Sequence, residues 1–254
     1  LRPIVEFMTW NFAILAADQI INSAAKMLQM SGGQYNVPIV FRGPNGQAGQ
    51  LAATHSQSFE SIYGHIPGLK VVTPSNPADA KGLLKSAIRA DDPVVFMESE
   101  KMYGDKGMIP DGEYLIPMGV ADVVQEGTDV TIVSFGKIMK VVNEAAAELA
   151  KDNISVEVID LRSIRPMDME TIIRSVRKTN RLLVVEESWP VASISSEIAY
   201  AVQRHAFDHL DAPVRRLTQT DTPFAFAKPL IDAALPQVAD VVRVVKESLY
   251  IPTN

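Results

Sequence analysis

One segment combines the residue types most able to carry out chemistry. The loop "FRGPNGQAGQLAATHSQ" (41–57) follows the apolar run "VPIVF", contains three glycines spaced three residues apart, and leads to His55. Glycine-rich turns can hold a phosphate on main-chain N–H groups, and imidazole is the side chain best matched to proton transfer near neutral pH. The loop is therefore a candidate phosphate site, a candidate carrier of a catalytic base, or a flexible turn.

The residues that follow the glycines argue against phosphate binding. A Walker-type loop requires Lys and then Ser or Thr after its last glycine, and Gln50-Leu51 stand there instead. A dinucleotide-binding loop requires an acidic residue about 20 residues further on, and no convincing one is present. We therefore expect an ordered loop at the carboxyl edge of a sheet, where α/β folds place their sites.

Three other groups of residues have both a functional and a structural interpretation. The segment "EFMTWNF" (6–12) is rich in large side chains; core packing is the default, although a flat ligand could also lie there. His205 and His209 lie four residues apart but lack a third metal ligand, so we expect a solvent-exposed helix face. The acidic pair Glu186-Glu187 ends an apolar run and is expected to lie at an exposed strand end.

Composition limits the classes of function. The chain has 254 residues, 47% of them hydrophobic, which suffices for one large domain or two smaller ones. A net charge of −6 argues against a nucleic-acid partner. No run of 18 apolar residues is present, which argues against a membrane span. The absence of cysteine excludes disulfides and cysteine-ligated metal.

Two series of alternating strands and helices must position these residues. In the first half we expect strands at 5–7, 37–43, 69–73 and 94–97, a helix over 12–30 ended by glycines, and a helix from Pro77 capped by Asn76. In the second half we expect a strand pair over 114–127, strands within 129–136, 155–162, 181–188 and 213–221, and helices within 137–150, 168–180, 193–207 and 235–249. The pattern predicts two α/β domains with mostly parallel sheets, over residues 1–113 and 114–254.

Several of these segments together resemble a known family. They include "EFMTWNF", "ADQIINSAAK", "MSGGQ", "VPIVFRGPNG", "THSQSF", "PGLKVVTPSNPADAKGLLKSAIR", "DPVVFMESEKMYG" and "LRSIRPMDMETI". In this order they resemble the β subunit of the pyruvate dehydrogenase E1 component, a thiamine-diphosphate-dependent 2-oxo acid dehydrogenase of transketolase-like architecture. The resemblance implies a pyrimidine-binding-type domain followed by a transketolase C-terminal-like domain.

The resemblance also implies partners and cofactors. It implies an α2β2 heterotetramer that oxidatively decarboxylates pyruvate and transfers the acetyl group to the lipoyl group of E2, the dihydrolipoyl acyltransferase. Thiamine diphosphate would lie between α and β, with its diphosphate and magnesium held by α. Such an enzyme would be cytoplasmic in a bacterium and in the mitochondrial matrix of a eukaryote.

Individual site residues follow from the same resemblance. Phe12 matches the ring that packs on the aminopyrimidine, Met8 lies in the same wall, and His55 matches the active-site histidine that handles protons during acyl transfer. A structural potassium site built mainly from main-chain carbonyls is matched by Ile39, Ala87, Ile88, Ala90 and Asp92.

Two departures from the family pattern accompany these matches. Leu15 stands where many members carry glutamine. The family's catalytic glutamate belongs to a segment upstream of Leu1, so we expect the sequence to be an N-terminally shortened form that cannot activate the cofactor by itself. Two alternatives stay open: a branched-chain 2-oxo acid or acetoin dehydrogenase β subunit, and a non-catalytic module for dimerisation and E2 docking.

Overall fold

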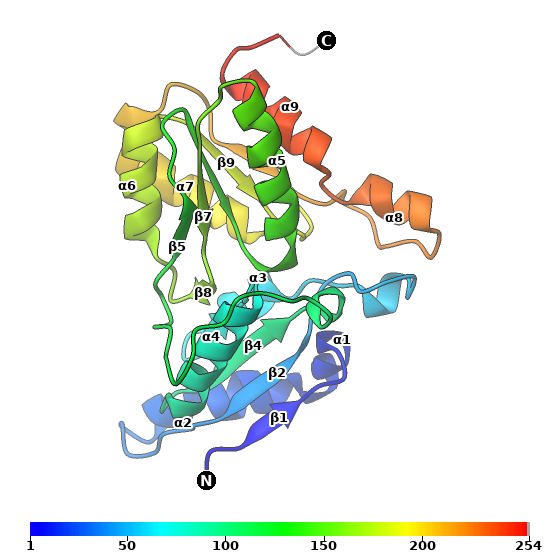
Figure 1. Cartoon of the computed structure of the whole chain (residues 1–254). Coiled ribbons are helices and arrows are strands. Elements are labelled where there is room, and N and C mark those ends of the chain that lie inside the picture. Colours follow the sequence, from blue (N-terminus) through cyan, green and yellow to red (C-terminus); the bar gives the residue numbers. More distant parts are fainter. Residues whose placement is uncertain (253–254) are drawn as a thin grey trace. The chain divides into compact units, whose positions relative to one another are not determined.

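Alternating strands and helices build two five-stranded sheets in the computed structural model, which describes residues 1–252 (Figure 1). Two compact units contain them. The first comprises Leu1–Val120, Arg162–Met167 and Pro223–Phe226, and the second comprises Ala121–Leu161, Asp168–Thr222 and the residues from Ala227 onward. The predicted fold class, two α/β domains with mostly parallel sheets, is confirmed.

The sheet of the first unit has the strand order β1-β2-β4-β3-β8. Its strands are β1 (Ile4–Glu6), β2 (Val40–Pro44), β4 (Val94–Glu98), β3 (Lys70–Val72) and β8 (Ser163–Arg165). The first four are parallel, and β8 pairs antiparallel with β3. The carboxyl ends of β1, β2 and β4 therefore meet at one edge, from which the glycine-containing loop leaves β2.

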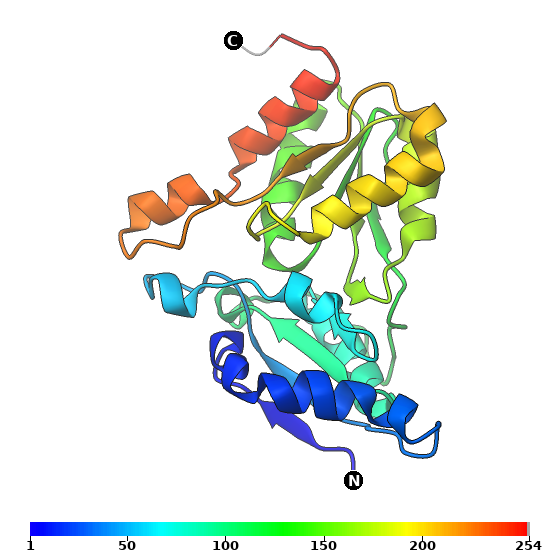
Figure 2. The ribbon, with the colours of Figure 1, turned by 180° about the vertical axis from the view of Figure 1, so that it is seen from behind.

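Helices cover both faces of this sheet (Figures 1 and 2). One face carries the continuous helical segment made of α1 (Trp10–Ala13), a 3₁₀ turn (Ile14–Ala16), a π-helical stretch (Gln19–Ala24) and α2 (Ala25–Met30). The other face carries α4 (Pro77–Arg89). Asn76 caps α4 as predicted, since its Oδ1 accepts a hydrogen bond of 2.9 Å from the N–H of Asp79.

Smaller elements complete the first unit: 3₁₀ turns at Ala53–His55 and Glu100–Met102, and α3 (Glu60–Gly64). Its core on the α4 side is formed by apolar side chains of β2, β3, β4 and α4. On the opposite side Trp10 is fully buried and its ring lies 5.0 Å from that of Tyr63. Burial raises the pKa of the Tyr63 phenol to about 12.

The sheet of the second unit has the order β10-β9-β6-β7-β5. Its strands are β10 (Arg215–Leu217), β9 (Leu182–Val185), β6 (Val130–Ser134), β7 (Val156–Asp160) and β5 (Asp122–Gln125), and only β5 runs antiparallel to its neighbour among these. The helices are α5 (Met139–Lys151), α6 (Met169–Thr179), α7 (Ile194–Ala206), α8 (Lys228–Ala234) and α9 (Val238–Ser248), with 3₁₀ turns at Gly136–Ile138 and Phe207–His209. Within this unit α5 and α9 cover one face of the sheet, and α6 and α7 cover the other (Figures 1 and 2).

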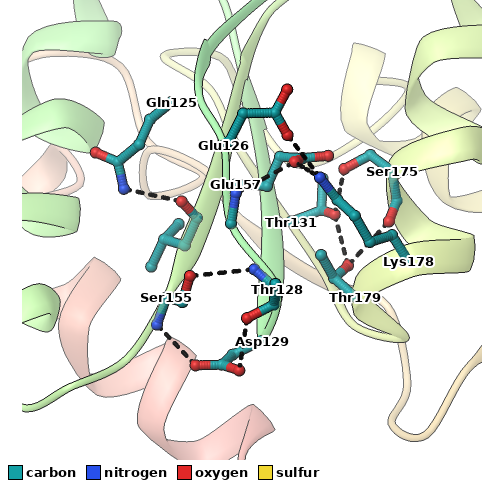
Figure 3. Close-up of polar contacts among 12 residues, drawn as sticks. Gln125, Glu126, Thr128, Asp129, Thr131, Ser155, Glu157, Ser175, Lys178 and Thr179 are labelled. Atoms are coloured by element: carbon teal, nitrogen blue, oxygen red, sulfur yellow. Dashed lines mark hydrogen bonds and ion pairs between the residues drawn. The ribbon is translucent and has the colours of Figure 1, made fainter.

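A polar network closes the amino end of this sheet (Figure 3). Lys178 on α6 forms ion pairs with Glu126 and with the buried Glu157 of β7. The hydrogen bonds and charges of the two carboxylates raise the pKa of Lys178, and the bond from Lys178 lowers the pKa of Glu126. Beside them the buried Thr131 hydroxyl lies 2.6 Å from those of Ser175 and Thr179.

Two expectations about the second half were wrong. The predicted strand pair over 114–127 contains one strand, β5, because residues 114–118 run along α4 instead: the Tyr114 hydroxyl donates to the carbonyl of Ala78, and Ile116 packs against Gly82. The pair Glu186-Glu187 is buried, not exposed. Glu186 accepts a hydrogen bond from the N–H of Ser195 at the start of α7, and Glu187 forms an ion pair of 2.7 Å with Lys137. These contacts lower the free-energy cost of burying the two carboxylates.

The expected solvent exposure of His205 and His209 is confirmed: His205 lies in the last turn of α7, His209 ends the 3₁₀ turn that follows it, and both are exposed. Among the helices that the structure describes, none is long and apolar enough to cross a lipid bilayer.

Candidate functional site

The candidate site lies at the carboxyl edge of the first sheet, where the turn after β1 meets the loop after β2. The two segments approach so closely that a side chain on Gly43 would place its Cβ 2.5 Å from the carbonyl oxygen of Phe7. The N–H of Phe7 donates to the carbonyl of Arg42 at 2.8 Å. Glycine is therefore required at position 43 because backbone, rather than a movable side chain, fills the space.

The turn after β1 sorts its large side chains into two directions. Thr9 has an extended backbone and caps α1, accepting from the N–H of Asn11. Phe7 and Trp10 turn inward, with ring centroids 5.3 Å apart. Met8 and Phe12 turn outward and remain 81% and 41% exposed. Core packing thus accounts for half of the apolar cluster and leaves an exposed apolar pair at the sheet edge.

His55 is brought to this exposed pair by the loop after β2. It ends the 3₁₀ turn Ala53–His55, which follows Ala52, a residue with a positive φ of 63°. The half-buried imidazole meets the Phe12 ring edge-on, with centroids 5.3 Å apart and planes at 85°. Its Nδ1 lies 2.9 Å from the hydroxyl oxygen of Thr54.

Two amides that the sequence did not single out join these segments. The buried Asn11 donates from Nδ2 to Thr9 Oγ1 at 2.7 Å. Its Oδ1 accepts from the backbone N–H of Gln57 at 3.2 Å and from Gln57 Nε2 at 3.1 Å. Amides in a turn have many ordinary roles, so only the fold, which brings together residues 46 positions apart, reveals this contact.

An ion-pair network lies on the α4 face below the same edge. Arg42 of β2 donates from Nε and Nη2 to the two carboxylate oxygens of Glu98, at 2.8 and 2.7 Å, and Tyr103 donates to Glu98 at 2.7 Å. The Glu98 carboxylate raises the pKa of Arg42, and burial together with the bond to Glu98 raises the pKa of the Tyr103 phenol. The network therefore ties β2 to the end of β4 beneath both loops.

The residues of the predicted potassium site also belong to the first unit. Ala87 and Ile88 are in the last turn of α4, and the carbonyl of Ile39 accepts from the N–H of Val94 at 2.9 Å. The guanidinium of Arg2 donates to the carbonyls of Ile88 and Ala90, at 3.4 and 2.6 Å.

Asp92, the remaining residue of that set, forms an ion pair of 2.8 Å with Lys70. Within residues 1–252, no group of three or more His, Cys, Asp and Glu side chains is arranged to hold a metal ion.

Comparison with known proteins defines the class of protein. The family model described as "Transketolase, pyrimidine binding domain" matches residues 1–106, and that described as "Transketolase, C-terminal domain" matches residues 119–241. A solved structure titled "Split gene transketolase, inactive beta4 tetramer" aligns with 99% of this chain and 77% of its own, with a TM-score of 0.78 and 22% identity. The chain therefore has a two-domain, transketolase-like fold.

More similar relatives identify the family. The pyruvate dehydrogenase E1 component subunit beta of Rhizobium meliloti is 55% identical over 98% of this chain, which spans 55% of that protein. The subunit beta of Rickettsia felis is 52% identical, and the mitochondrial subunit beta-1 of Oryza sativa is also 52% identical; the chain spans 77% and 68% of their lengths. The chain belongs to the family of pyruvate dehydrogenase E1 component β subunits.

Proposed function

We propose that this chain provides the β part of a pyruvate dehydrogenase E1 enzyme, which oxidatively decarboxylates pyruvate and passes the acetyl group to the lipoyl group of E2. The observation that carries this proposal is the exposed Phe12 ring held against His55 at the carboxyl edge of the first sheet. An aromatic face beside a proton-transfer group suits a flat heterocyclic cofactor in a family of this kind.

The residues at this edge fit the aminopyrimidine end of thiamine diphosphate. Phe12 and Met8 present exposed apolar surface at the start of α1, so a ring stacked on them would cover side chains that water otherwise contacts. When bound, the cofactor would supply the electron sink that lets the carboxylate leave a 2-oxo acid. Phe12 and Met8 would bind and orient it, and they would keep water away from its ring.

His55 would handle the proton of the transfer step. In the transfer, the two-carbon unit that remains after decarboxylation of pyruvate would form a carbon–sulfur bond to one lipoyl sulfur while the disulfide bond of the lipoyl ring breaks. The two-carbon unit is thereby oxidised to the acetyl level, and its two electrons reduce the lipoyl disulfide. The second sulfur then leaves as a thiolate and needs a proton. Imidazole is the side chain best matched to proton transfer near neutral pH and is suited to give it.

The assembly is proposed from the same resemblance. We infer an α2β2 enzyme in which an α subunit holds the diphosphate and its magnesium, and a second β subunit and E2 are further partners. Residues 1–113 would form the pyrimidine-binding-type domain, and residues 114–254 would contribute to dimerisation and E2 docking. The compartment would be the cytoplasm of a bacterium or the mitochondrial matrix of a eukaryote.

A structural potassium ion is proposed at the carbonyls of Ile39, Ala87, Ile88 and Ala90 and at Asp92. The convergence of two of these carbonyls on the guanidinium of Arg2 supports it, because oxygen ligands that gather around one cationic group also suit a hard monovalent cation. Potassium chloride should then raise the thermal midpoint more than sodium chloride at equal ionic strength. Equal midpoints in the two salts would contradict the proposed site.

Reconstitution tests the proposed function. The natural protein would be combined with its α subunit and assayed with thiamine diphosphate, magnesium and a lipoylated E2 domain. We expect faster acylation of the lipoyl group with pyruvate than with a branched-chain 2-oxo acid. A preference for the branched substrate would instead support the alternative that the chain is a branched-chain 2-oxo acid dehydrogenase β subunit. The absence of turnover with any 2-oxo acid would refute the proposal.

A further inference from the structure

We propose that Asn11 is a positioning residue that fixes His55 against the Phe12 ring through its hydrogen bonds to Gln57. We call these Asn11–Gln57 bonds the clasp. The inference rests on the proposed function, since it assigns Asn11 a role in the step that His55 serves. The supporting observation is a set of hydrogen bonds that joins the turn after β1 to the loop after β2.

The amide of Asn11 forms hydrogen bonds through both its nitrogen and its oxygen. It is 6% exposed, and its Nδ2 donates to Thr9 Oγ1 while its Oδ1 accepts two bonds from Gln57. An amide is the side chain that can donate on one side and accept on the other. A carboxylate in its place would lose the donor to Thr9 and would bury a charge, and alanine would remove all three bonds.

The two ends of the clasp are directly linked to the functional pair. Asn11 immediately precedes Phe12 in α1, and Gln57 stands two residues after His55. The carbonyl of Gln57 also accepts a 3.0 Å bond from the N–H of Gly46, which holds the strand-proximal part of the same loop. Displacement of Gln57 would therefore move His55 relative to the ring that it contacts edge-on.

The His55 turn itself offers little local restraint. It spans three residues, and its internal backbone bond, from the N–H of His55 to the carbonyl of Ala52, is long at 3.3 Å. Ala52 has a positive φ of 63°, a backbone conformation that costs alanine free energy and needs support from the surroundings. The Asn11–Gln57 bonds supply a tie from a helix that is anchored by the fully buried Trp10.

The test uses two reactions of the reconstituted, full-length enzyme. Reduction of an artificial electron acceptor by pyruvate requires the cofactor but not transfer to the lipoyl group; acetylation of a lipoylated E2 domain requires both. We expect Asn11→Ala to slow lipoyl acetylation by about 100-fold, the scale of a 1 Å misplacement, with a much smaller effect on acceptor reduction. Asn143→Ala, at an exposed position on α5, is the matched control and should change neither.

Two further variants separate positioning from general damage. The double variant Asn11→Ala/His55→Ala should be no slower in lipoyl acetylation than His55→Ala alone, because Asn11 acts through the histidine. Gln57→Glu, which retains the backbone bond to Asn11, should give an intermediate loss. Equal losses in both reactions, or multiplicative losses in the double variant, would overturn the proposal.

A measurement that needs no turnover keeps the clasp testable if the proposed function fails. The rate at which diethyl pyrocarbonate modifies His55 in the full-length protein can be followed by mass spectrometry of the peptide that contains it. Release of the turn in Asn11→Ala should speed the modification several-fold, roughly in proportion to the added exposure. An unchanged rate would show that Asn11 does not hold the histidine, whatever reaction the enzyme catalyses.

Discussion

The buried ion pair between Asp79 and Arg162 provides a quantitative test of how the first unit is held together. Arg162 donates from Nε and Nη2 to the two oxygens of Asp79, at 3.0 and 2.8 Å, and Asp79 is 2% exposed. Asp79 lies in the first turn of α4, and Arg162 directly precedes β8, so the pair ties β8 to the helix that covers the sheet. Its geometry is that of a bidentate, charge-assisted contact.

Replacement of Asp79 by alanine removes the carboxylate that holds this guanidinium. Loss of one partner of a buried pair destabilises a protein by about 3–5 kcal/mol, because the remaining charge stays desolvated. At about 2–4 °C for each kcal/mol in a chain of this size, the thermal midpoint should fall by about 6–20 °C. The free energy of unfolding would be measured by urea denaturation followed by circular dichroism.

A double-mutant cycle isolates the interaction. Asp79→Ala, Arg162→Ala and the double variant should give a coupling free energy of about 1–3 kcal/mol. Glu113→Ala is the matched control, since Glu113 pairs with Arg89 at the surface and should cost less than about 1 kcal/mol. If Asp79→Ala costs no more than Glu113→Ala, or if the two single effects simply add, the pair does not hold β8 in place.

Three other substitutions test local parts of the account. Gly43→Ala should destabilise the protein by about 1–3 kcal/mol, because its Cβ would meet the Phe7 carbonyl; an unchanged urea midpoint would contradict this close approach. Lys178→Met should lower the free energy of unfolding by about 1–2 kcal/mol, because it removes the partner of the buried Glu157; the effect is smaller than for a fully buried pair since Lys178 is partly exposed. If Lys178→Met is equally destabilising in a Glu157→Gln background, the charge of Glu157 is not responsible. The Tyr63 phenol should ionise near pH 12. Because the raised pKa favours the neutral form, the stability that it contributes is present below about pH 10 and is lost as the pH rises towards 12. The measurement is an ultraviolet titration of the wild type and of Tyr63→Phe; a difference between them that titrates near pH 10 would show that burial does not raise the pKa of Tyr63.

Local sequence signals predicted the elements that depend on local chemistry. Asn76 before Pro77 marked the start of α4, and the glycines after Met30 marked the end of the first helical segment, where the N–H of Gly33 donates to the carbonyl of Leu28 at 2.8 Å. Apolar runs likewise marked the central parallel strands, such as β4, β6, β7 and β9, most of whose residues are buried.

Features that depend on distant partners were not predictable in this way. β8 is a three-residue strand that pairs with β3, far earlier in the chain, and nothing in "SIR" distinguishes it from a turn. The burial of Glu186 and Glu187 depends on Ser195 and Lys137, whose positions only the fold determines. Both failures concern partners that lie outside the local window.

The residues of the candidate site also include some that the sequence identified and some that only the structure revealed. His55 and Phe12 were identified from a resemblance, and the structure adds their edge-on contact at 5.3 Å. Asn11 and Gln57 were missed because an amide in a turn carries no distinctive spacing, and their significance comes from the bonds between them. The resemblance thus suggested which groups could react, and the hydrogen bonds in the fold support the proposal that Asn11 and Gln57 hold them.

The most direct test of the proposed cofactor wall is the affinity of the full-length enzyme, assembled with its α subunit, for thiamine diphosphate. Loss of a buried Phe side chain costs about 1.5–3 kcal/mol, so Phe12→Ala should raise the dissociation constant about 10- to 150-fold. Phe207→Ala, at an exposed ring in the second unit, is the matched control and should leave it unchanged. Isothermal titration calorimetry that gives the same dissociation constant for Phe12→Ala and the wild type would contradict the assignment of this edge to the cofactor.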